Sequence, residues 1–371
     1  MNKIKTIILY GPKINVVNKK VYGGGTGGYT RNMSVYLKYF KFSNFQIVPC
    51  YHTIKGEINL SLFTKPIRLF IDVFAFLLVL SKNRTKCVHI LGQYRGAVVR
   101  EFVIVLLSKV FGKSIIYEIK AGAFIDSYNA RDRFYKKMID IIIHYSDKIL
   151  VEGKVYKEYI SNYYHKESHY FPNVVPNVEV PNEIHQKFQN KELKVIFVGY
   201  AYEGKGIKEL VDGCSIFAQE QRSIELTLVG QIHPDIKTMI DNLPSSDYFK
   251  INTKGKLTHS DVLLEFTKND VYCYPTKHSG EGHNNTINEA LMYGMIISST
   301  KKGFIGDFLN KENSYPIEEL KSEEISKVFV EIIKDTSLAI KKSKKGRSLI
   351  LEQFNTEKAK TKLEKYYNQL F

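Results

Sequence analysis

Short, β-rich apolar runs alternate with helical patterns along most of this chain, and that alternation constrains its fold more than any other feature. In the first half the runs are Thr6–Tyr10, Gln46–Val48, Val88–Leu91, Ser114–Ile119 and Lys148–Val151. In the second half they are Lys194–Val198, Glu225–Gly230, Lys250–Asn252, Val271–Tyr274 and Met295–Ser299. Strands that alternate with helices form parallel sheets covered by helices on both faces. The sequence therefore predicts an α/β protein with doubly wound sheets.

The alternation restarts near residue 190, and a segment rich in proline and asparagine, residues 171–186, separates the halves. Such a composition is typical of a linker. A chain of 371 residues is also long for one core. We therefore predict a first Rossmann-like domain over residues 1–180 and a second over 181–355. The closing helical stretch, residues 356–371, is expected to pack back on the first domain.

The charge of the chain limits its partners. The formal net charge is +16, which favours anionic partners such as nucleic acid, acidic lipids or phosphorylated substrates. The basic residues are scattered, and no RNA-binding signature or zinc-finger spacing accompanies them, so we expect no nucleic acid partner. The opening MNKIKTIILYG predicts a buried strand and not a signal peptide, which favours the cytoplasm.

Two further features concern the core. The most apolar stretch, Ile67–Leu80, contains Arg68 and Asp72 and is too short to span a bilayer. We expect a core helix there, with a helix lying on a membrane surface as the alternative. The four cysteines are far apart in the sequence, which predicts buried free thiols and neither a disulfide framework nor a zinc site. They are Cys50, Cys87, Cys214 and Cys273.

The stretch Val271–Ser299 carries the most chemical information. A strand ends at Pro275, a polar loop follows, and a helix is predicted over Thr286–Tyr293. Glu281 precedes this helix and Glu289 lies eight positions later. The first turn of a helix offers N–H groups and partial positive charge to a diphosphate, and carboxylates accept hydrogen bonds from sugar and ribose hydroxyls. The alternative for Glu289 is a capping box with Thr286, in which it only completes its own helix.

This stretch resembles the donor motif of glycosyltransferase family 4, a retaining family with the GT-B fold of two Rossmann-like domains facing across a cleft. The motif is Glu-Gly, six further residues, Glu-Ala-Leu and a nearby Gly, and the chain has EGHNNTINEALMYG from Glu281 to Gly294. The resemblance implies that Glu281 contacts the hydroxyls of the transferred sugar and that Glu289 binds the ribose. It also implies that the diphosphate lies against the backbone of His283, Asn284 and Asn285 and against Thr286. Gly282 lets the backbone approach a ligand closely.

A second stretch, VIFVGYAYEGKGIKEL from Val195 to Leu210, resembles the family's first strand of the second domain with its Lys-Gly. The resemblance implies that Lys205 neutralises the leaving diphosphate, which is electrostatic stabilisation of developing charge. The alternative is a solvated lysine near a helix start. The family usually has Arg directly after the Gly that ends this strand. Here Gly199 is followed by Tyr200. We place both residues in the donor-binding site, and the source of a second cation stays open.

The first domain contains fewer motifs. Gly23, Gly25 and Gly28 formally match a dinucleotide fingerprint, but the loop begins about a dozen residues after the strand, and no acidic residue ends the next strand. The resemblance implies that this loop faces the donor phosphates through Gly25, Thr26 and Gly27, with Arg31 nearby. An inert flexible loop is the alternative.

The family often has a histidine after the fourth strand, and Lys120 occupies about that place here, so Lys120 is the catalytic candidate of the first domain. Glu118 and Lys120 either line the cleft or lie at the surface. His89 lies inside a strand, where a histidine is typically a core residue with its hydrogen bonds satisfied.

The resemblance implies a retaining transferase that moves a hexose from a nucleotide-diphosphate sugar to a hydroxyl of a glycan or lipid-linked glycan. It further implies a front-face reaction that needs no cofactor and no metal. A residue composition typical of AT-rich bacteria suggests surface polysaccharide synthesis by analogy, at the cytoplasmic face of the membrane. Two alternatives are an NAD-type oxidoreductase using the Gly23–Gly28 loop and a non-enzymatic basic module that binds anionic glycan or membrane.

Overall fold

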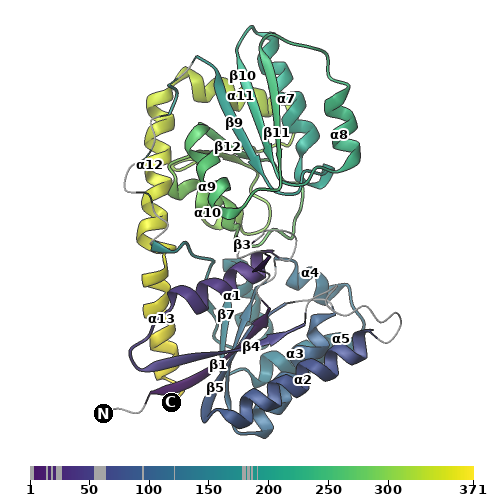
Figure 1. The fold of residues 1–371 in the computed structure, drawn as a ribbon, viewed down its shortest axis with the longest axis vertical. Coiled ribbons are helices and arrows are strands. Elements are labelled where there is room, and N and C mark those ends of the chain that lie inside the picture. The colour runs from purple at the N-terminus through teal and green to yellow at the C-terminus, as the bar shows by residue number, and fades with distance from the viewer. Residues whose placement is uncertain are drawn as a thin grey trace. The chain divides into compact units, whose positions relative to one another are not determined.

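The computed structural model describes the chain in two compact units, drawn in Figure 1. The described residues are 4–13, 16–17, 20–21, 27–53, 64–93, 96–120, 122–177, 181, 184, 187–189 and 191–371. The first unit comprises residues 1–15, 26–173 and 356–371, and the second comprises residues 16–25 and 174–355. A strand pair, β2 (Val16–Val17) and β3 (Lys20–Val21), is counted with the second unit.

The first unit is built on a six-stranded parallel sheet with the order β4-β1-β5-β6-β7-β8. Its strands are β1 (Lys5–Pro12), β4 (Phe45–His52), β5 (Thr85–Gly92), β6 (Ser114–Ile119), β7 (Lys148–Val151) and β8 (His169–Tyr170). The middle strands are buried on both faces, as the apolar run Ile7–Leu9 predicts. The chain places β4 on one side of β1 and the later strands on the other side, so the strand order reverses at β1. Ligands of such a sheet bind near the loop after this strand.

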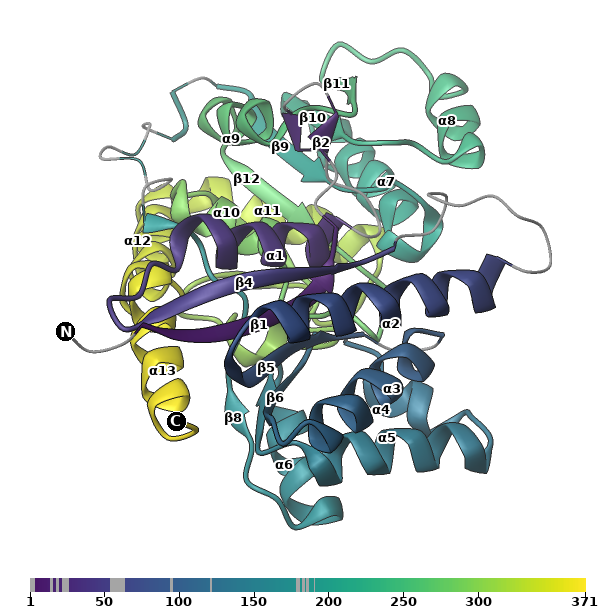
Figure 2. The same ribbon diagram turned by 60° about the horizontal axis from the view of Figure 1, so that its bottom comes forward.

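Helices cover both faces of this sheet. They are α1 (Gly27–Tyr39), α2 (Thr64–Lys82), α3 (Ala97–Val110), α4 (Phe124–Asn129), α5 (Arg133–Tyr145), α6 (Lys154–Tyr164) and α13 (Thr356–Asn368). Figure 2 shows α2, α3 and α5 side by side on one face. The closing helix α13 belongs to this unit, and its Tyr367 packs against Phe45 of β4.

The second unit repeats the plan with a six-stranded parallel sheet in the order β11-β10-β9-β12-β13-β14. Its strands are β9 (Leu193–Val198), β10 (Ile224–Val229), β11 (Phe249–Gly255), β12 (Val271–Tyr274), β13 (Ile296–Ser299) and β14 (Tyr315–Pro316). The strand order reverses at β9, which pairs with β10 on one side and with β12 on the other. The loops after β9 and β12 therefore meet where doubly wound sheets bind ligands.

The second unit also has six α-helices and two short 3₁₀ turns among its described residues. They are α7 (Ile207–Gln219), α8 (Pro234–Asp241), α9 (His259–Lys268), α10 (Asn285–Met292), α11 (Ser322–Lys334) and α12 (Thr336–Gln353), with η3 (Glu203–Lys205) and η4 (Ile305–Asp307).

Every strand expected from the apolar runs is present, with ends shifted by a few residues at most. The two-residue strands β8 and β14 and the β2–β3 pair were not predicted, because two residues carry no readable periodicity. All four cysteines are free and buried, as expected. The stretch Ile67–Leu80 lies in α2, but the expectation of a core helix is wrong for one of its faces, since Phe70 and Phe74 are exposed. Among the described residues, no helix has the length and apolarity needed to cross a membrane.

Candidate active site

The predicted donor stretch forms the end of β12, a loop and the start of α10. The four residues of β12 are buried, and the helix α10 begins at Asn285. Asn284 caps it, because its side-chain oxygen accepts hydrogen bonds from the backbone N–H of Thr286 at 2.9 Å and of Ile287 at 3.0 Å. The cap fixes how the loop enters the helix, and it points the first turn of α10 toward the carboxyl edge of the sheet.

This cap decides between the two interpretations of Glu289. With Asn284 as the N-cap, Glu289 is the fifth residue of α10 and lies beyond the third position that a capping box requires. Its buried carboxylate lies instead 3.1 Å from Nε2 of His259, the first residue of α9. The capping-box alternative is therefore wrong, and the residue that sequence reasoning missed is His259.

Lys205 and Glu281, separated by 76 residues in sequence, form an ion pair through Nζ and Oε1. Both side chains are mostly buried, at 15% and 10% exposure. Tyr274 bridges the pair, because its hydroxyl accepts from Lys205 Nζ at 2.7 Å and lies 3.2 Å from Glu281 Oε1. Thr276 donates to the same Oε1 at 2.9 Å. The alternative of a solvated Lys205 is therefore wrong.

The electrostatics of this cluster keep its phenols protonated. Burial, and then the carboxylate of Glu281, raise the pKa of Tyr274 well above its usual value. Burial and Glu281 also raise the pKa of Tyr202. A neutral phenol donates to a carboxylate without adding negative charge. The Lys205–Glu281 pair therefore lies in a partly desolvated setting, where charge–charge interactions are stronger than in water.

Two glycines let the backbone close around the cluster. Gly206 has φ +69°, and a Cβ there would lie 1.9 Å from the carbonyl oxygen of Pro275, so the loop after β9 packs tightly against the end of β12. Gly303 has φ +58°, and a Cβ there would lie 2.1 Å from the carbonyl oxygen of Glu281. These close approaches hold Lys205 and Glu281 together.

The remaining residues predicted in this unit divide by environment. Gly282, Asn284, Asn285 and Thr286 are half-buried at the start of α10, beside Glu281. The His283 side chain is buried in the core, with its ring 4.4 Å from that of Phe308 and 4.9 Å from that of Phe354. Only the backbone of His283 is therefore available to a ligand at the helix start.

The other predicted pair, Gly199 and Tyr200, follows β9 in the loop that also carries Lys205. Tyr200 is exposed, and its ring centre lies 5.3 Å from that of Tyr202 and 6.3 Å from that of His233. An aromatic group thus occupies the place where the resembling family usually has a cation.

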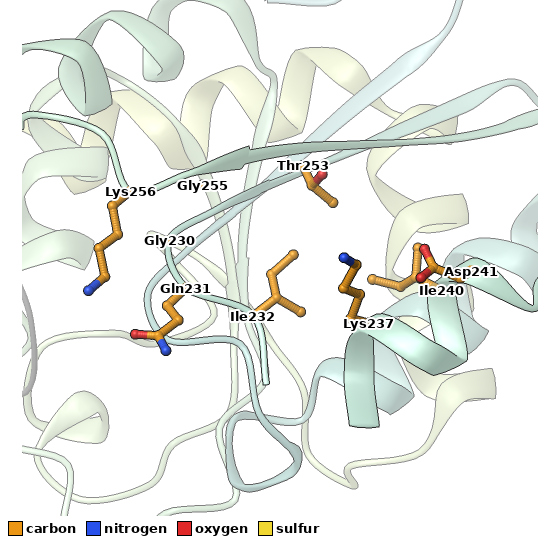
Figure 3. Close-up of a pocket in the computed structure, with 9 residues that line it drawn as sticks. All are labelled: Gly230, Gln231, Ile232, Lys237, Ile240, Asp241, Thr253, Gly255 and Lys256. Atoms are coloured by element: carbon orange, nitrogen blue, oxygen red, sulfur yellow. The ribbon is translucent and has the colours of Figure 1, made fainter. Parts of the chain in front are cut away.

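A cavity of about 380 Å³ opens at the carboxyl ends of β10 and β11. Figure 3 shows its lining by the loop after β10, by α8 and by the end of β11. Its walls combine apolar Ile232 and Ile240 with the charged side chains of Lys237 and Asp241. None of the residues predicted to bind the donor lines it. Lys256, at its edge, comes three residues before His259, whose ring contacts Glu289.

In the first unit, Lys120 follows β6 and is buried, so the surface alternative for it and Glu118 is wrong. Its Nζ lies 2.7 Å from Glu118 Oε1 and 2.9 Å from Asn173 Oδ1, with Glu152 at 3.6 Å. Burial alone would raise the pKa of Glu118, but Lys120 and His89 outweigh it and lower that pKa to about 2.

His89 extends this network to the closing helix. Its Nε2 lies 3.3 Å from Glu118 Oε2, and its Nδ1 lies 2.8 Å from the hydroxyl of Tyr367 on α13. The ring has no exposed surface, which confirms the interpretation of His89 as a core histidine. Gly25 and Thr26 lie outside the described residues. Gly27 is the first residue of α1, and Arg31 lies half-buried in the same helix.

Comparison with known proteins connects this geometry to a family. Residues 180–349 match the family model described as glycosyl transferases group 1. This match covers most of the second unit, which contains both Lys205 and Glu281. One curated relative, the capsular polysaccharide biosynthesis glycosyltransferase CapM of Staphylococcus aureus, is 23% identical over 190 residues. That match covers 50% of this chain and 48% of CapM, so the chain spans about half the length of this relative.

Solved structures match over nearly the whole chain. Sucrose-phosphate synthase of Thermosynechococcus elongatus has a TM-score of 0.76 and 16% identity, covering 99% of each chain. A glycosyltransferase of Rickettsia africae has a TM-score of 0.71 and 16% identity, covering 99% of this chain and 98% of its own. HepE of Anabaena, in complex with UDP-glucose, has a TM-score of 0.69 and 10% identity over 98% of this chain and 99% of its own. The fold is GT-B, as predicted.

The residues matched by the family model include Lys205, Glu281 and Glu289, which favours the donor interpretation of this unit over the two alternatives. The oxidoreductase alternative depended on the Gly23–Gly28 loop. Of those residues the structure describes only Gly27 and Gly28, and both belong to the first turn of α1.

Proposed function

We propose that this protein is a retaining glycosyltransferase that moves a hexose from a nucleotide-diphosphate sugar to a hydroxyl of a glycan or lipid-linked glycan. The observation that carries the proposal is the buried ion pair of Lys205 and Glu281. It lies near the start of α10, at the edge of the sheet where the strand order reverses. CapM, named for capsular polysaccharide biosynthesis, supports a role in bacterial surface polysaccharide synthesis. Structures of HepE in complex with UDP and with UDP-glucose support a sugar-nucleotide donor.

In this proposal the diphosphate lies against the first turn of α10, where backbone N–H groups and the helix dipole favour negative charge. Gly282 and the backbone from His283 to Thr286 form that surface. Lys205 meets the leaving diphosphate, and Glu281 accepts hydrogen bonds from hydroxyls of the transferred sugar. A donor of this kind offers each member of the ion pair a new partner of the right charge or hydrogen-bonding type.

Glu289 and the neighbouring cavity fit the nucleoside part of the donor. A buried carboxylate held by His259 is suited to accept two hydrogen bonds from a ribose diol. The cavity at Lys256 lies along the same edge of the sheet and has the size of a small-molecule site. We propose that it receives the base.

The proposed reaction is a front-face displacement. The bond between the anomeric carbon and the phosphate oxygen breaks, and a bond from the acceptor hydroxyl forms on the same face of the sugar. The hydroxyl proton passes to an oxygen of the leaving diphosphate, so no covalent enzyme intermediate forms. Lys205 stabilises the charge that develops on the diphosphate, and we propose that the step needs no metal and no further cofactor.

Lys120 fits a positioning role better than direct contact with the substrate. Its Nζ is occupied by Glu118 and Asn173. Held there, it orders the end of β6, at the edge of the first sheet where an acceptor would bind. For the whole protein we propose a cytoplasmic location at the inner face of the membrane, where a lipid-linked acceptor is reached.

Calorimetry with UDP, GDP and several sugar nucleotides tests the donor proposal directly. Wild-type protein should bind at least one of these nucleotides, and Glu289→Ala should bind the same one more weakly. The absence of any nucleotide binding by the wild type would overturn the donor site. Undiminished binding by Glu289→Ala would remove the ribose role of that residue. A panel of sugar nucleotides with a glycan acceptor then identifies the transferred sugar.

A further inference from the structure

Helix α2 presents a stripe of large apolar side chains to solvent. Phe70, Phe74 and Leu78 recur at every fourth position, and their exposed fractions are 72%, 55% and 42%. The rings of Phe70 and Phe74 stack with their centres 6.4 Å apart. Ile71, beside them, is 40% exposed. Single exposed apolar residues are common, but a continuous stripe of this kind marks an interaction surface.

Helix α3 continues this surface. It lies beside α2 on the same face of the first sheet, as Figure 2 shows, so the outer sides of both helices point away from the sheet. Val99 near its start is 41% exposed, and Val110 at its end is 80% exposed. We define the α2–α3 face by the exposed side chains of Phe70, Ile71, Phe74, Leu78, Val99 and Val110.

Within residues 64–113 the exposed charges that the structure describes have one sign, and Lys109 of α3 pairs with Asp147 from outside this stretch. Between residues 64 and 113 the sequence has two acidic residues, Asp72 and Glu101. Both are buried, at 1% exposure each. Asp72 is paired with Arg100, and Glu101 accepts the backbone N–H of Gln93. The exposed charged residues described in this stretch are Lys65, Lys82, Arg84 and Lys86, all positive.

We propose that the α2–α3 face is the surface by which this protein lies on an anionic lipid bilayer. The apolar side chains would enter the boundary between headgroups and acyl chains, and the surrounding lysines and Arg84 would meet anionic headgroups. This is the arrangement of an interfacial helix: a strong apolar side, basic residues at its margins and exposed lysines able to reach the headgroups.

The charge pattern favours a bilayer over a second copy of the chain. Pairing two such faces would bring Lys65, Lys82 and Arg84 of both copies together, and like charges across an interface are unfavourable. An anionic bilayer neutralises the same residues. The face belongs to the first unit and contains none of the residues assigned to the donor, so it is independent of the donor chemistry.

Sedimentation with lipid vesicles tests the proposal. Wild-type protein should bind vesicles of phosphatidylcholine with phosphatidylglycerol, and should bind vesicles of phosphatidylcholine alone much less. The Phe70→Ser/Phe74→Ser variant should lose at least about tenfold in affinity for the anionic vesicles. The Lys82→Glu/Arg84→Glu variant should lose binding as well, and salt at about 0.5 M should weaken the wild type.

A matched control is Leu338→Ser/Leu351→Ser on α12, which alters two exposed apolar residues of the second unit and should leave vesicle binding unchanged. Thermal unfolding and nucleotide calorimetry show whether each variant remains folded and still binds donor. Wild-type protein that ignores anionic vesicles would overturn the proposal, as would equal binding by Phe70→Ser/Phe74→Ser. A wild-type dimer that this variant converts to monomer, without change in vesicle binding, would assign the face to a second copy instead.

Discussion

Nε2 of His259 lies 3.1 Å from Oε1 of Glu289, across 30 residues of sequence and two different helices. Glu289 is nearly buried, whereas a third of the His259 side chain is exposed. The contact helps to orient the buried carboxylate of Glu289. In the proposed donor site it therefore contributes to how the carboxylate oxygens face the ribose.

Replacing His259 should weaken donor binding without stopping the reaction. We expect His259→Ala to raise the KM for the donor several-fold and to change kcat little, because the lost contact serves binding and not the reacting atoms. His259→Gln, whose amide nitrogen can reach the same oxygen, should restore much of the affinity. Steady-state kinetics over a range of donor concentrations separates the two parameters. His144→Ala, an exposed histidine of the first unit, is the control. A fall in kcat alone would contradict the positioning role.

Lys205→Ala should lower kcat more than it weakens donor binding, which is the opposite of the effect expected for His259→Ala. Removing the cation leaves the charge on the leaving diphosphate without its partner, so we expect kcat to fall by about 10²–10³, as when one preorganised donor is removed from other active sites. Donor affinity measured by calorimetry should change less. Lys208→Ala removes an exposed lysine one turn along and should leave both quantities near wild type. If Lys205→Ala lost donor binding and kept kcat, the lysine would serve binding only.

The strands of both sheets and the donor stretch could be predicted from the sequence because both depend on short-range patterns. The short apolar runs predict β9 and β12 directly, and Glu281 and Glu289 belong to one local motif. The residues that contact those glutamates could not be predicted in this way. His259 contacts Glu289 from another helix, and Lys205 reaches Glu281 across 76 residues of sequence, where Gly206 allows the loop after β9 to approach Pro275. Contacts of this kind depend on packing and leave no local pattern.

For the same reason, the partners of Lys120 and the exposed side of α2 could not be predicted from the sequence. A lysine after a strand is compatible with a surface or a cleft, and only the packed structure shows Glu118, Glu152 and Asn173 around its amine. In α2 the sequence is apolar on nearly all sides, so periodicity could not identify the side that stays uncovered.

Glu118→Gln should destabilise the first unit. The substitution removes the charge that pairs with Lys120 and leaves a buried ammonium less compensated, which costs about 3–5 kcal/mol in comparable pairs. Because the folded-state pKa of Glu118 is lowered from 4.5 to about 2, its contribution is fully present above about pH 4.5 and is lost as the pH falls toward 2. Urea unfolding should therefore show a large difference between wild type and variant near neutral pH and a smaller one near pH 3. A difference that is independent of pH would contradict the ion pair.

Lys187 should also make stability rise with pH, but in the second unit and in an alkaline window. Its buried amine donates to the carbonyl oxygens of Phe266 at 3.1 Å and Asn269 at 2.6 Å, at the end of α9, and burial lowers its pKa from 10.5 to about 8. The unfolded chain therefore binds more protons than the folded one between pH 8 and 10.5, so this residue makes the folded state more stable as the pH rises through that window. The shift corresponds to about 3 kcal/mol.

Lys187→Met removes the titration, so the stability of the wild type relative to this variant should increase from pH 7.5 to 10 in urea unfolding followed by circular dichroism. Buried tyrosines that ionise at high pH are common to both proteins and cancel in the difference. Parallel stability curves for the two proteins over this range would mean that the Lys187 amine titrates as it does in water.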